Sequence, residues 1–205
     1  MDLAVFGATG GTGRLLVVQA LDVGHRVTAL ARDPGGVPER AGLTVVRGDA
    51  RDAQAVAVVV RGQDAVLVAV GTSARAGVVT VCADAVANVL VAMGCHRVRR
   101  LVVLSAYGAF DSYDGGLYDR VVWLVQGRKM LDKERMEELV RRSAVDWTVV
   151  RPPALTNGPR TGRYRVGEDL RVGLTSRVSR ADVADFMLRA AADAACVGRA
   201  PTIAS

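Results

Sequence analysis

Residues 5–13 (VFGATGGTG) place four glycines directly after a short apolar run and before a longer aliphatic stretch. This pattern predicts a buried strand that turns through the glycines into a helix. Gly7 has no Cβ and can form the tight turn, while Gly10 or Gly11 lets a pyrophosphate approach the backbone. Gly13 lets the helix pack closely on the strand. Since the free N–H groups and the positive dipole end of the helix would face the anion, we predict a dinucleotide-binding turn rather than a purely structural one.

Arg32 ends the second expected strand, about 20 positions after the glycines. In nicotinamide dinucleotide sites an acid at this place binds the ribose 2′-hydroxyl, whereas an arginine accepts a 2′-phosphate. Asp33 follows one residue later, so an acidic group is also near. Arg14, at the start of the first helix, opposes the helix dipole and is better explained by a nearby phosphate. We therefore predict NADP (NADPH) rather than NAD as the cofactor; the alternative is that Arg32 is a surface charge beside a Pro-Gly turn.

Two further residues follow expected strands at the same edge of the sheet. Asp49 comes after the third strand, where it could hydrogen-bond the adenine amino group or cap the next helix. Gly71 comes after the fourth strand and suits either a backbone close to the cofactor ribose or an ordinary turn. Both are candidate cofactor-binding residues.

Ser105 ends the fifth expected strand, where its hydroxyl could hydrogen-bond a reacting heteroatom or complete the strand end. A typical short-chain dehydrogenase also needs a tyrosine four residues before a lysine, because the lysine lowers the phenol pKa for general acid catalysis. None of the tyrosines has a lysine at that spacing. Aromatic residues gather between positions 107 and 123 and could line a pocket for a planar ring; core packing is the alternative for Tyr118 and Trp123.

Strand and helix patterns alternate along the chain. Hydrophobic periodicity predicts strands at 3–6, 26–31, 43–47, 64–70, 101–104 and 146–150, and helices at 15–23, 52–61, 78–93 (closed by Gly94), 117–142 (broken near Gly127) and from a Ser179 cap onward. This alternation predicts the α/β class, a doubly wound Rossmann fold with a mostly parallel sheet in a single domain, residues 1–205. The substrate side would be formed mainly by residues 105–125 and 152–180, the second segment carrying short extended pieces.

The composition excludes several function classes. A chain of 205 residues that is 50% hydrophobic suits one domain with a substantial core. No apolar run reaches the roughly 18 residues of a membrane span, and no signal peptide precedes the first strand, so we expect a cytoplasmic protein without a membrane partner. Three cysteines without a CxxC pair predict neither a disulfide framework nor a metal site.

The net charge of +6 makes nucleic acid a partner to consider. Arg97, Arg99 and Arg100 precede the fifth strand, at the edge opposite the ligands, so we interpret them as solvated charges. Arginines between positions 160 and 180 follow the last clear strand, where they could overhang the ligand edge and favour an anionic small molecule. We therefore expect no nucleic acid partner, and a monomer or small homo-oligomer.

With these residues in view, the chain resembles the atypical short-chain dehydrogenase/reductases, and among them most closely the biliverdin-IXβ reductases, also called flavin reductases. The resemblance runs nearly end to end. It is carried by FGATGGTG, VTALARD, GQDAVLVAVGT, the serine of VVLSA, VRPPALTNGPRTGRY and SRADVADFMLR, of which the last two are the most specific. It implies a single-domain, NADPH-dependent reductase.

The resemblance also implies roles for individual residues. It places Ser105 beside nicotinamide and substrate, Arg32 at the 2′-phosphate, and backbone contacts with the nicotinamide side at Pro152 and Pro153. The cofactor loop is implied at Gly7, Thr9, Gly10, Thr12 and Gly13.

The chain departs from the biliverdin-IXβ reductases at three other places. They have a histidine where Ala154 stands and another where Lys133 stands, so their substrate pocket is not preserved. Lys133 instead matches a lysine of other atypical members that contacts the cofactor ribose. Gly36 stands where those reductases have a second basic contact with the 2′-phosphate.

We therefore predict an NADPH-dependent oxidoreductase that transfers hydride to a planar conjugated acceptor, such as a flavin, a quinone or a tetrapyrrole. Ser105 would orient the acceptor or relay a proton, and Lys133 would position the ribose. The alternative is a catalytically silent NAD(P)-binding redox sensor, of the nitrogen-metabolite-repressor type, that acts through a protein partner. The missing tyrosine keeps that alternative open.

Overall fold

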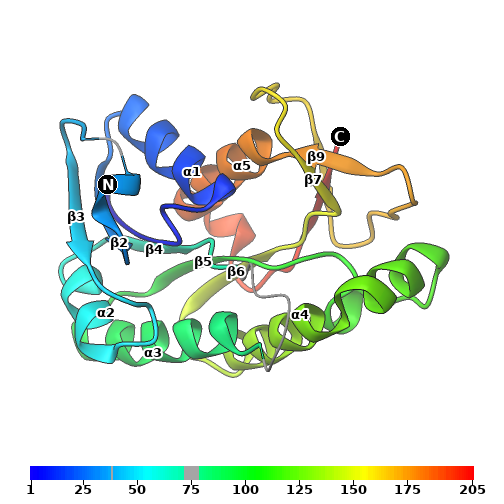
Figure 1. Ribbon diagram of the computed structural model, residues 1–205, viewed down its shortest axis with the longest axis horizontal. Coiled ribbons are helices and arrows are strands. Elements are labelled where there is room, and N and C mark those ends of the chain that lie inside the picture. Colours follow the sequence, from blue (N-terminus) through cyan, green and yellow to red (C-terminus); the bar gives the residue numbers. More distant parts are fainter. Residues whose placement is uncertain (38, 72–78) are drawn as a thin grey trace.

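The computed structural model describes residues 1–37, 39–71 and 79–205 of the chain. Its centre is one sheet of six parallel strands in the order β3-β2-β1-β4-β5-β6 (Figure 1). The strands are β1 (Asp2–Phe6), β2 (Arg26–Ala31), β3 (Leu43–Arg47), β4 (Ala65–Val68), β5 (Arg100–Leu104) and β6 (Asp146–Val150). This order is that of the doubly wound dinucleotide-binding fold, so the predicted fold class is confirmed. Residue 78, the expected start of the third helix, lies outside the described residues.

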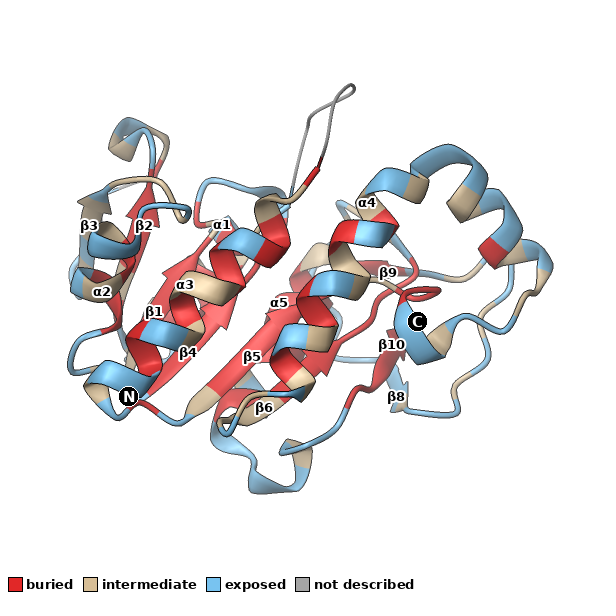
Figure 2. Ribbon diagram, turned by 90° about the horizontal axis from the view of Figure 1, so that it is seen from below, coloured by how far each residue is buried: buried red, intermediate tan, exposed pale blue. Residues whose placement is uncertain are grey.

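Helices cover both faces of the sheet. The helices α1 (Gly11–Asp22) and α5 (Arg180–Ala192) lie on one face, and α2 (Ala53–Val60), α3 (Val81–His96) and α4 (Leu117–Arg141) lie on the other (Figure 1). Side chains of β1 alternate between the two layers, since Leu3 and Val5 pack toward α1 and α5, whereas Ala4 and Phe6 pack toward the other three helices. The central strands β1, β4 and β5 are therefore buried on both sides, together with the inward faces of the helices (Figure 2). No helix in the described part of the chain has the length and apolar character needed to cross a membrane.

The order in which successive strands are added to the sheet reverses at β1. The strands β2 and β3 lie on one side of it, and β4, β5 and β6 lie on the other. In open α/β sheets ligands bind at such a point, outside the carboxyl ends of the strands. The topology brings to this edge the residues that follow β1 to β5, which are Gly7, Arg32, Asp49, Gly71 and Ser105.

The segment after β6 contains the short extended pieces that the sequence predicts. The strand β7 (Ala154–Thr156) pairs in parallel with β9 (Arg177–Ser179). The strand β8 (Arg165–Gly167) pairs antiparallel with β10 (Thr202–Ala204), close to the end of the chain. Single turns of 3₁₀ helix complete the elements at Pro34–Gly36, Phe110–Ser112 and Ala194–Cys196.

Two predicted helix features are confirmed. The helix α4 contains one non-helical residue, Gln126, directly before Gly127, where a break was expected. Ser179 caps α5, since its Oγ accepts a hydrogen bond from the Asp182 amide (2.9 Å).

The predicted end of α3 was wrong. The helix does not end at Gly94 but continues to His96, and Arg97 then adopts the left-handed conformation (φ 57°). The closing hydrogen bond runs from the Val98 amide to the Met93 carbonyl (3.0 Å). A glycine inside a helix is tolerated, so the position of this backbone bond decides where the helix ends.

The interpretation of Arg100 as a solvated charge was also wrong. Its guanidinium is half-buried at the start of β5 and donates to the carbonyl oxygens of Asp146 (2.5 Å) and Ala190 (2.5 Å) and to Thr148 Oγ1 (2.6 Å). Burial lowers the pKa of this guanidinium. Arg100 therefore joins β5, β6 and α5, while Arg99 stays exposed as expected.

Candidate cofactor and active site

The turn after β1 has no room for a side chain at Gly7 or at Gly13. Gly7 has a φ of +85°, and a Cβ at this position would lie 2.5 Å from the Ala69 carbonyl oxygen. A Cβ on Gly13 would lie 2.0 Å from the Gly7 carbonyl oxygen, far inside van der Waals contact. The helix α1 begins at Gly11 with no side-chain cap and no acidic residue in its first turn. The turn therefore fits the pyrophosphate of a dinucleotide, which the positive end of α1 would face.

A cavity of about 610 Å³ opens beside the glycine turn at the carboxyl edge of the sheet. It is enclosed by the turn, by the residues that follow β2, β3 and β4, and by the start of α3. Its walls include six of the predicted cofactor-binding residues, which are Gly7, Thr9, Gly10, Arg32, Asp49 and Gly71. A Cβ on Gly71 would meet no atom of the described residues within 4 Å.

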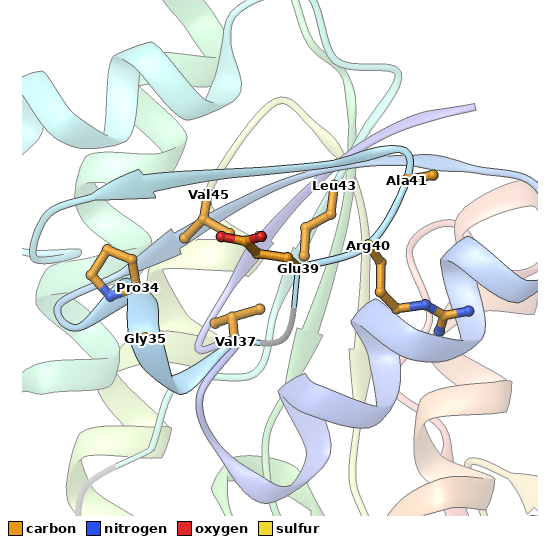
Figure 3. A pocket seen from close by; sticks show the side chains of 8 residues that line it. All are labelled: Pro34, Gly35, Val37, Glu39, Arg40, Ala41, Leu43 and Val45. Atoms are coloured by element: carbon orange, nitrogen blue, oxygen red, sulfur yellow. The ribbon is translucent and has the colours of Figure 1, made fainter.

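A larger hollow, of about 930 Å³, lies along β3 and the segment before it (Figure 3). Its lining is mainly aliphatic, with Glu39 and Arg40 as its charged side chains among the described residues. Arg40 points toward α1 (Figure 3), where it pairs with Asp22 (2.8 Å). We assign the functional site to the smaller cavity, because it combines the glycine turn with several groups able to bind phosphate and ribose.

Asp49 and Arg51 form an ion pair in the wall of the smaller cavity. Arg51 Nη2 donates to Asp49 Oδ2 (2.8 Å), and Nε donates to Oδ1 (3.1 Å). These bonds, with a smaller contribution from the charge of Arg32, lower the pKa of Asp49 to about 2. Asp49 does not cap α2, because Asp52 accepts the bond from the Gln54 amide (2.9 Å). Arg51 was not predicted as a site residue, although its place two residues after Asp49 could have indicated it.

Arg14 reaches the place where the biliverdin-IXβ reductases would carry their second basic residue. A Cβ on Gly36 would lie 3.7 Å from Arg14 Nη2 and 3.4 Å from Thr9 Cγ2. The Arg14 guanidinium therefore lies beside Gly36 and close to the glycine turn. A residue of α1 thus supplies a positive charge where the loop residue has no side chain.

Arg180, the first residue of α5, lies across the start of α1. A Cβ on Gly11 would lie 2.9 Å from both Cδ and Nε of Arg180. The guanidinium is held by Asn157, because Nη1 donates to Asn157 Oδ1 (2.6 Å). Of the arginines expected to overhang the ligand edge, this one reaches the glycine turn, whereas Arg160 pairs with Asp185 (3.6 Å).

Lys133, in α4, joins the ends of two central strands. Its Nζ donates to the carbonyl oxygens of Leu104 (2.6 Å) and Val70 (3.3 Å). Leu104 is the last residue of β5, and Val70 lies two residues after the end of β4. The ammonium group therefore lies at the carboxyl edge of the sheet. An ammonium has three N–H donors, and these two carbonyl oxygens use two of them. This placement is compatible with the ribose contact that the resemblance implies.

Ser105 is buried at the end of β5 and bonded to an acid. Its Oγ lies 2.5 Å from Glu137 Oε1, a distance typical of a hydroxyl that donates to a carboxylate. Glu137, in α4, is fully buried and forms an ion pair with Arg151, which follows β6. Arg151 also contacts Asp111. Glu137 was not predicted as a partner, because 32 residues of sequence separate it from Ser105.

The remaining predicted residues surround this network. Pro152 and Pro153 are buried, and the Pro152 carbonyl accepts a hydrogen bond from the Tyr107 amide (2.9 Å). Tyr107 lies edge-on to Tyr118, with ring centroids 5.6 Å apart. The Trp123 indole donates to a backbone carbonyl (2.9 Å). Tyr118 and Trp123 are each half-buried.

Comparison with known proteins identifies the family. Residues 7–194 match the model of NAD(P)H-binding proteins. The match spans most of the chain and includes the glycine turn and every strand that reaches the ligand edge after it. The chain belongs to the NAD(P)H-binding family. The predicted membership of an NAD(P)-binding family is confirmed.

Two curated relatives of this NAD(P)H-binding protein are similar over different lengths. A protein of Aspergillus terreus named reductase pytE is 26% identical over an alignment 254 positions long, which covers 98% of this chain and 97% of the relative. An uncharacterized chloroplastic protein of Arabidopsis thaliana is 28% identical over 169 residues, or 77% of this chain. The aligned part spans 60% of the length of that plant relative.

Solved structures share the fold of this NAD(P)H-binding protein. The oxidoreductase ylbE from Lactococcus lactis superposes with a TM-score of 0.86 at 19% identity, covering 99% of this chain and 90% of that one. ChuY, an anaerobilin reductase from Escherichia coli, gives 0.85 at 23% identity, with coverages of 99% and 96%. A short-chain dehydrogenase/reductase from Veillonella parvula in complex with NADP gives 0.83 at 17% identity, with coverages of 100% and 94%.

Proposed function

We propose that this chain is an NADPH-dependent reductase of a planar conjugated acceptor, of the flavin, quinone or tetrapyrrole class. The observation that carries the proposal is the edge of the sheet, where a glycine turn shaped for a dinucleotide adjoins Lys133 and Ser105 at the ends of the central strands. The names of similar proteins support reduction as the reaction, since the relative from Aspergillus terreus is a reductase and ChuY is an anaerobilin reductase.

NADPH is proposed over NADH because basic groups gather near the adenosine end of the site. Arg32 and Arg51 line the cavity, and Arg14 lies beside the glycine turn. The two acids nearby are already bonded: Asp49 pairs with Arg51, and Asp33 accepts from a backbone amide of its own loop (3.2 Å). Guanidinium groups are well suited to phosphate, so a 2′-phosphate fits this surface better than a free hydroxyl.

The residues of the chain would bind and orient the reactants. The reduced nicotinamide, when bound, supplies the hydride. The glycine turn with Thr9 and Thr12 would hold the pyrophosphate, and Lys133 would hold the ribose next to the nicotinamide. Pro152 and Pro153 would border the nicotinamide through their backbone.

Other residues would fix the rest of the cofactor and the acceptor. Asp49 would bind the adenine amino group, and Gly71 would let the ribose lie close to the backbone. Ser105 would orient the acceptor at the end of β5. Solvent would complete its protonation.

Arg32→Ala should weaken NADPH binding by about 1.5–3 kcal/mol, the range for a hydrogen bond to a charged group, and should leave NADH binding nearly unchanged. The reason is that NADPH alone has the 2′-phosphate that Arg32 would contact. Titration calorimetry with both cofactors measures the difference. Arg61→Ala is the matched control, because Arg61 is exposed at the end of α2 and lies outside the walls of the cavity. Equal losses for NADPH and NADH would remove Arg32 from this role.

A steady-state assay of NADPH oxidation tests the reductase function directly. Flavin, quinone and tetrapyrrole acceptors are offered separately to the purified chain. We expect cofactor oxidation that depends on the acceptor and saturates with it. Tight NADPH binding with no oxidation by any of the three would instead support a catalytically silent redox sensor.

A further inference from the structure

The hydroxyl group of Ser105 donates its hydrogen bond to Glu137. The two side-chain oxygens lie 2.5 Å apart, and Glu137 has no exposed surface from which water could compete. Arg151 donates to the same Oε1 through Nε (3.2 Å) and is ion-paired with the other oxygen. Because a guanidinium is always charged, its partner here is the carboxylate, which can only accept hydrogen bonds. The proton between Ser105 and Glu137 therefore comes from the serine.

A serine that donates to a carboxylate keeps its lone pairs for other partners. Ser105 follows β5 directly, and the preceding carbonyl, that of Leu104, is bonded to Lys133 Nζ at the carboxyl edge of the sheet. Breaking the Ser105–Glu137 bond to turn the proton toward a ligand would leave a buried carboxylate oxygen short of a donor, which is costly. Toward a ligand, Ser105 is thus a hydrogen-bond acceptor.

We propose that Ser105, fixed by Glu137, selects conjugated acceptors that carry a ring N–H over those that present only carbonyl oxygens. The proposal rests on the reductase function proposed above and narrows its substrate class. Oxidised flavins and linear tetrapyrroles carry ring N–H groups, whereas quinones carry none. A ring N–H can donate to the Ser105 lone pair, but a quinone oxygen facing the same lone pair would be repelled.

The same geometry separates the two roles expected of Ser105. It orients the acceptor and does not relay a proton to it. In the proposed reaction the acceptor takes a hydride from the reduced cofactor, which is thereby oxidised, and takes its remaining proton from solvent. No proton from Ser105 is required.

Lumiflavin and its N3-methyl derivative form a matched pair of probes, because oxidised flavin has its ring N–H at N3. Each is tested with the wild-type chain and with Ser105→Ala. Two quantities are measured: kcat/KM for NADPH oxidation, and the Kd of each flavin for the NADP⁺-bound protein, from flavin fluorescence. We expect the wild type to prefer lumiflavin by about tenfold, roughly the value of one hydrogen bond, and the variant to lose that preference.

Ser143→Ala is the control for loss of a serine hydroxyl, since Ser143 lies beyond the end of α4 and donates to the Val140 carbonyl (2.6 Å). It should keep the wild-type preference. A preference that persists in Ser105→Ala, or equal affinities of the two flavins for the wild type, overturns the proposal. A loss of NADPH affinity in Ser105→Ala with the flavin preference intact also overturns it, because Ser105 Oγ would then contact the cofactor and not the acceptor. A preference in Kd that depends on Ser105, in a protein that oxidises no NADPH, supports this proposal. It contradicts only the reductase function.

Discussion

Glu137→Ala should lower the free energy of unfolding by about 3–5 kcal/mol, the usual cost of removing one partner of a buried ion pair. Glu137 is fully buried, and Arg151 beside it has only 4% of its surface exposed. The substitution leaves this guanidinium with Asp111, an exposed acid, as its remaining ion-pair partner among the described residues. It also removes the group to which Ser105 donates.

Denaturant unfolding of the variant and of a control measures this cost. Glu138→Ala is a close match, because Glu138 is the next residue of α4 and pairs with Arg142 (2.7 Å) at the surface. An exposed pair of this kind contributes about 0–1 kcal/mol. Equal losses in the two variants would mean that Arg151 finds full compensation elsewhere, and that the network around Ser105 is weaker than its geometry indicates.

The glycine turn and the sheet could be predicted because their causes are local. Only glycine suits the positive φ at Gly7 and the close backbone approach at Gly13. The residue type at each position therefore indicates the local backbone structure. The central strands β1, β4 and β5 are short apolar runs buried on both faces, and continuous apolar runs of this kind are typical of parallel strands. The order of Gly7, Arg32, Asp49, Gly71 and Ser105 along the edge then follows from the topology.

The partners of the site residues could not be predicted, because they depend on packing between distant elements. Glu137 stands among several charged residues of α4 and shows no pattern that separates it from its half-exposed neighbour Glu138. Only the packing of α4 against the ends of β5 and β6 places it between Ser105 and Arg151. Arg180 was one of many arginines in its segment, and the packing of α5 beside α1 brings it to the glycine turn.

An unconjugated ketone should be reduced with a kcat/KM about 10²–10⁴-fold below that of a flavin, which is the usual value of general acid–base assistance. Reduction of an isolated ketone builds negative charge on one oxygen, which then needs a proton donor poised near neutrality. A conjugated acceptor spreads the incoming charge over many atoms and depends far less on such a donor.

The groups near the end of β5 are poor candidates for that donor. The proton of Ser105 is held by Glu137, and Lys133 is bonded to two backbone carbonyls. Tyr107 lies two residues after Ser105, but burial and the negative charge of Asp114 raise its pKa, whereas a catalytic phenol needs a lowered one. Parallel assays of NADPH oxidation with lumiflavin and with a simple aliphatic ketone, at equal cofactor saturation, measure the ratio. Efficient reduction of the ketone would show that a proton donor acts at this edge of the sheet, and that the acceptor class proposed for the chain is wrong.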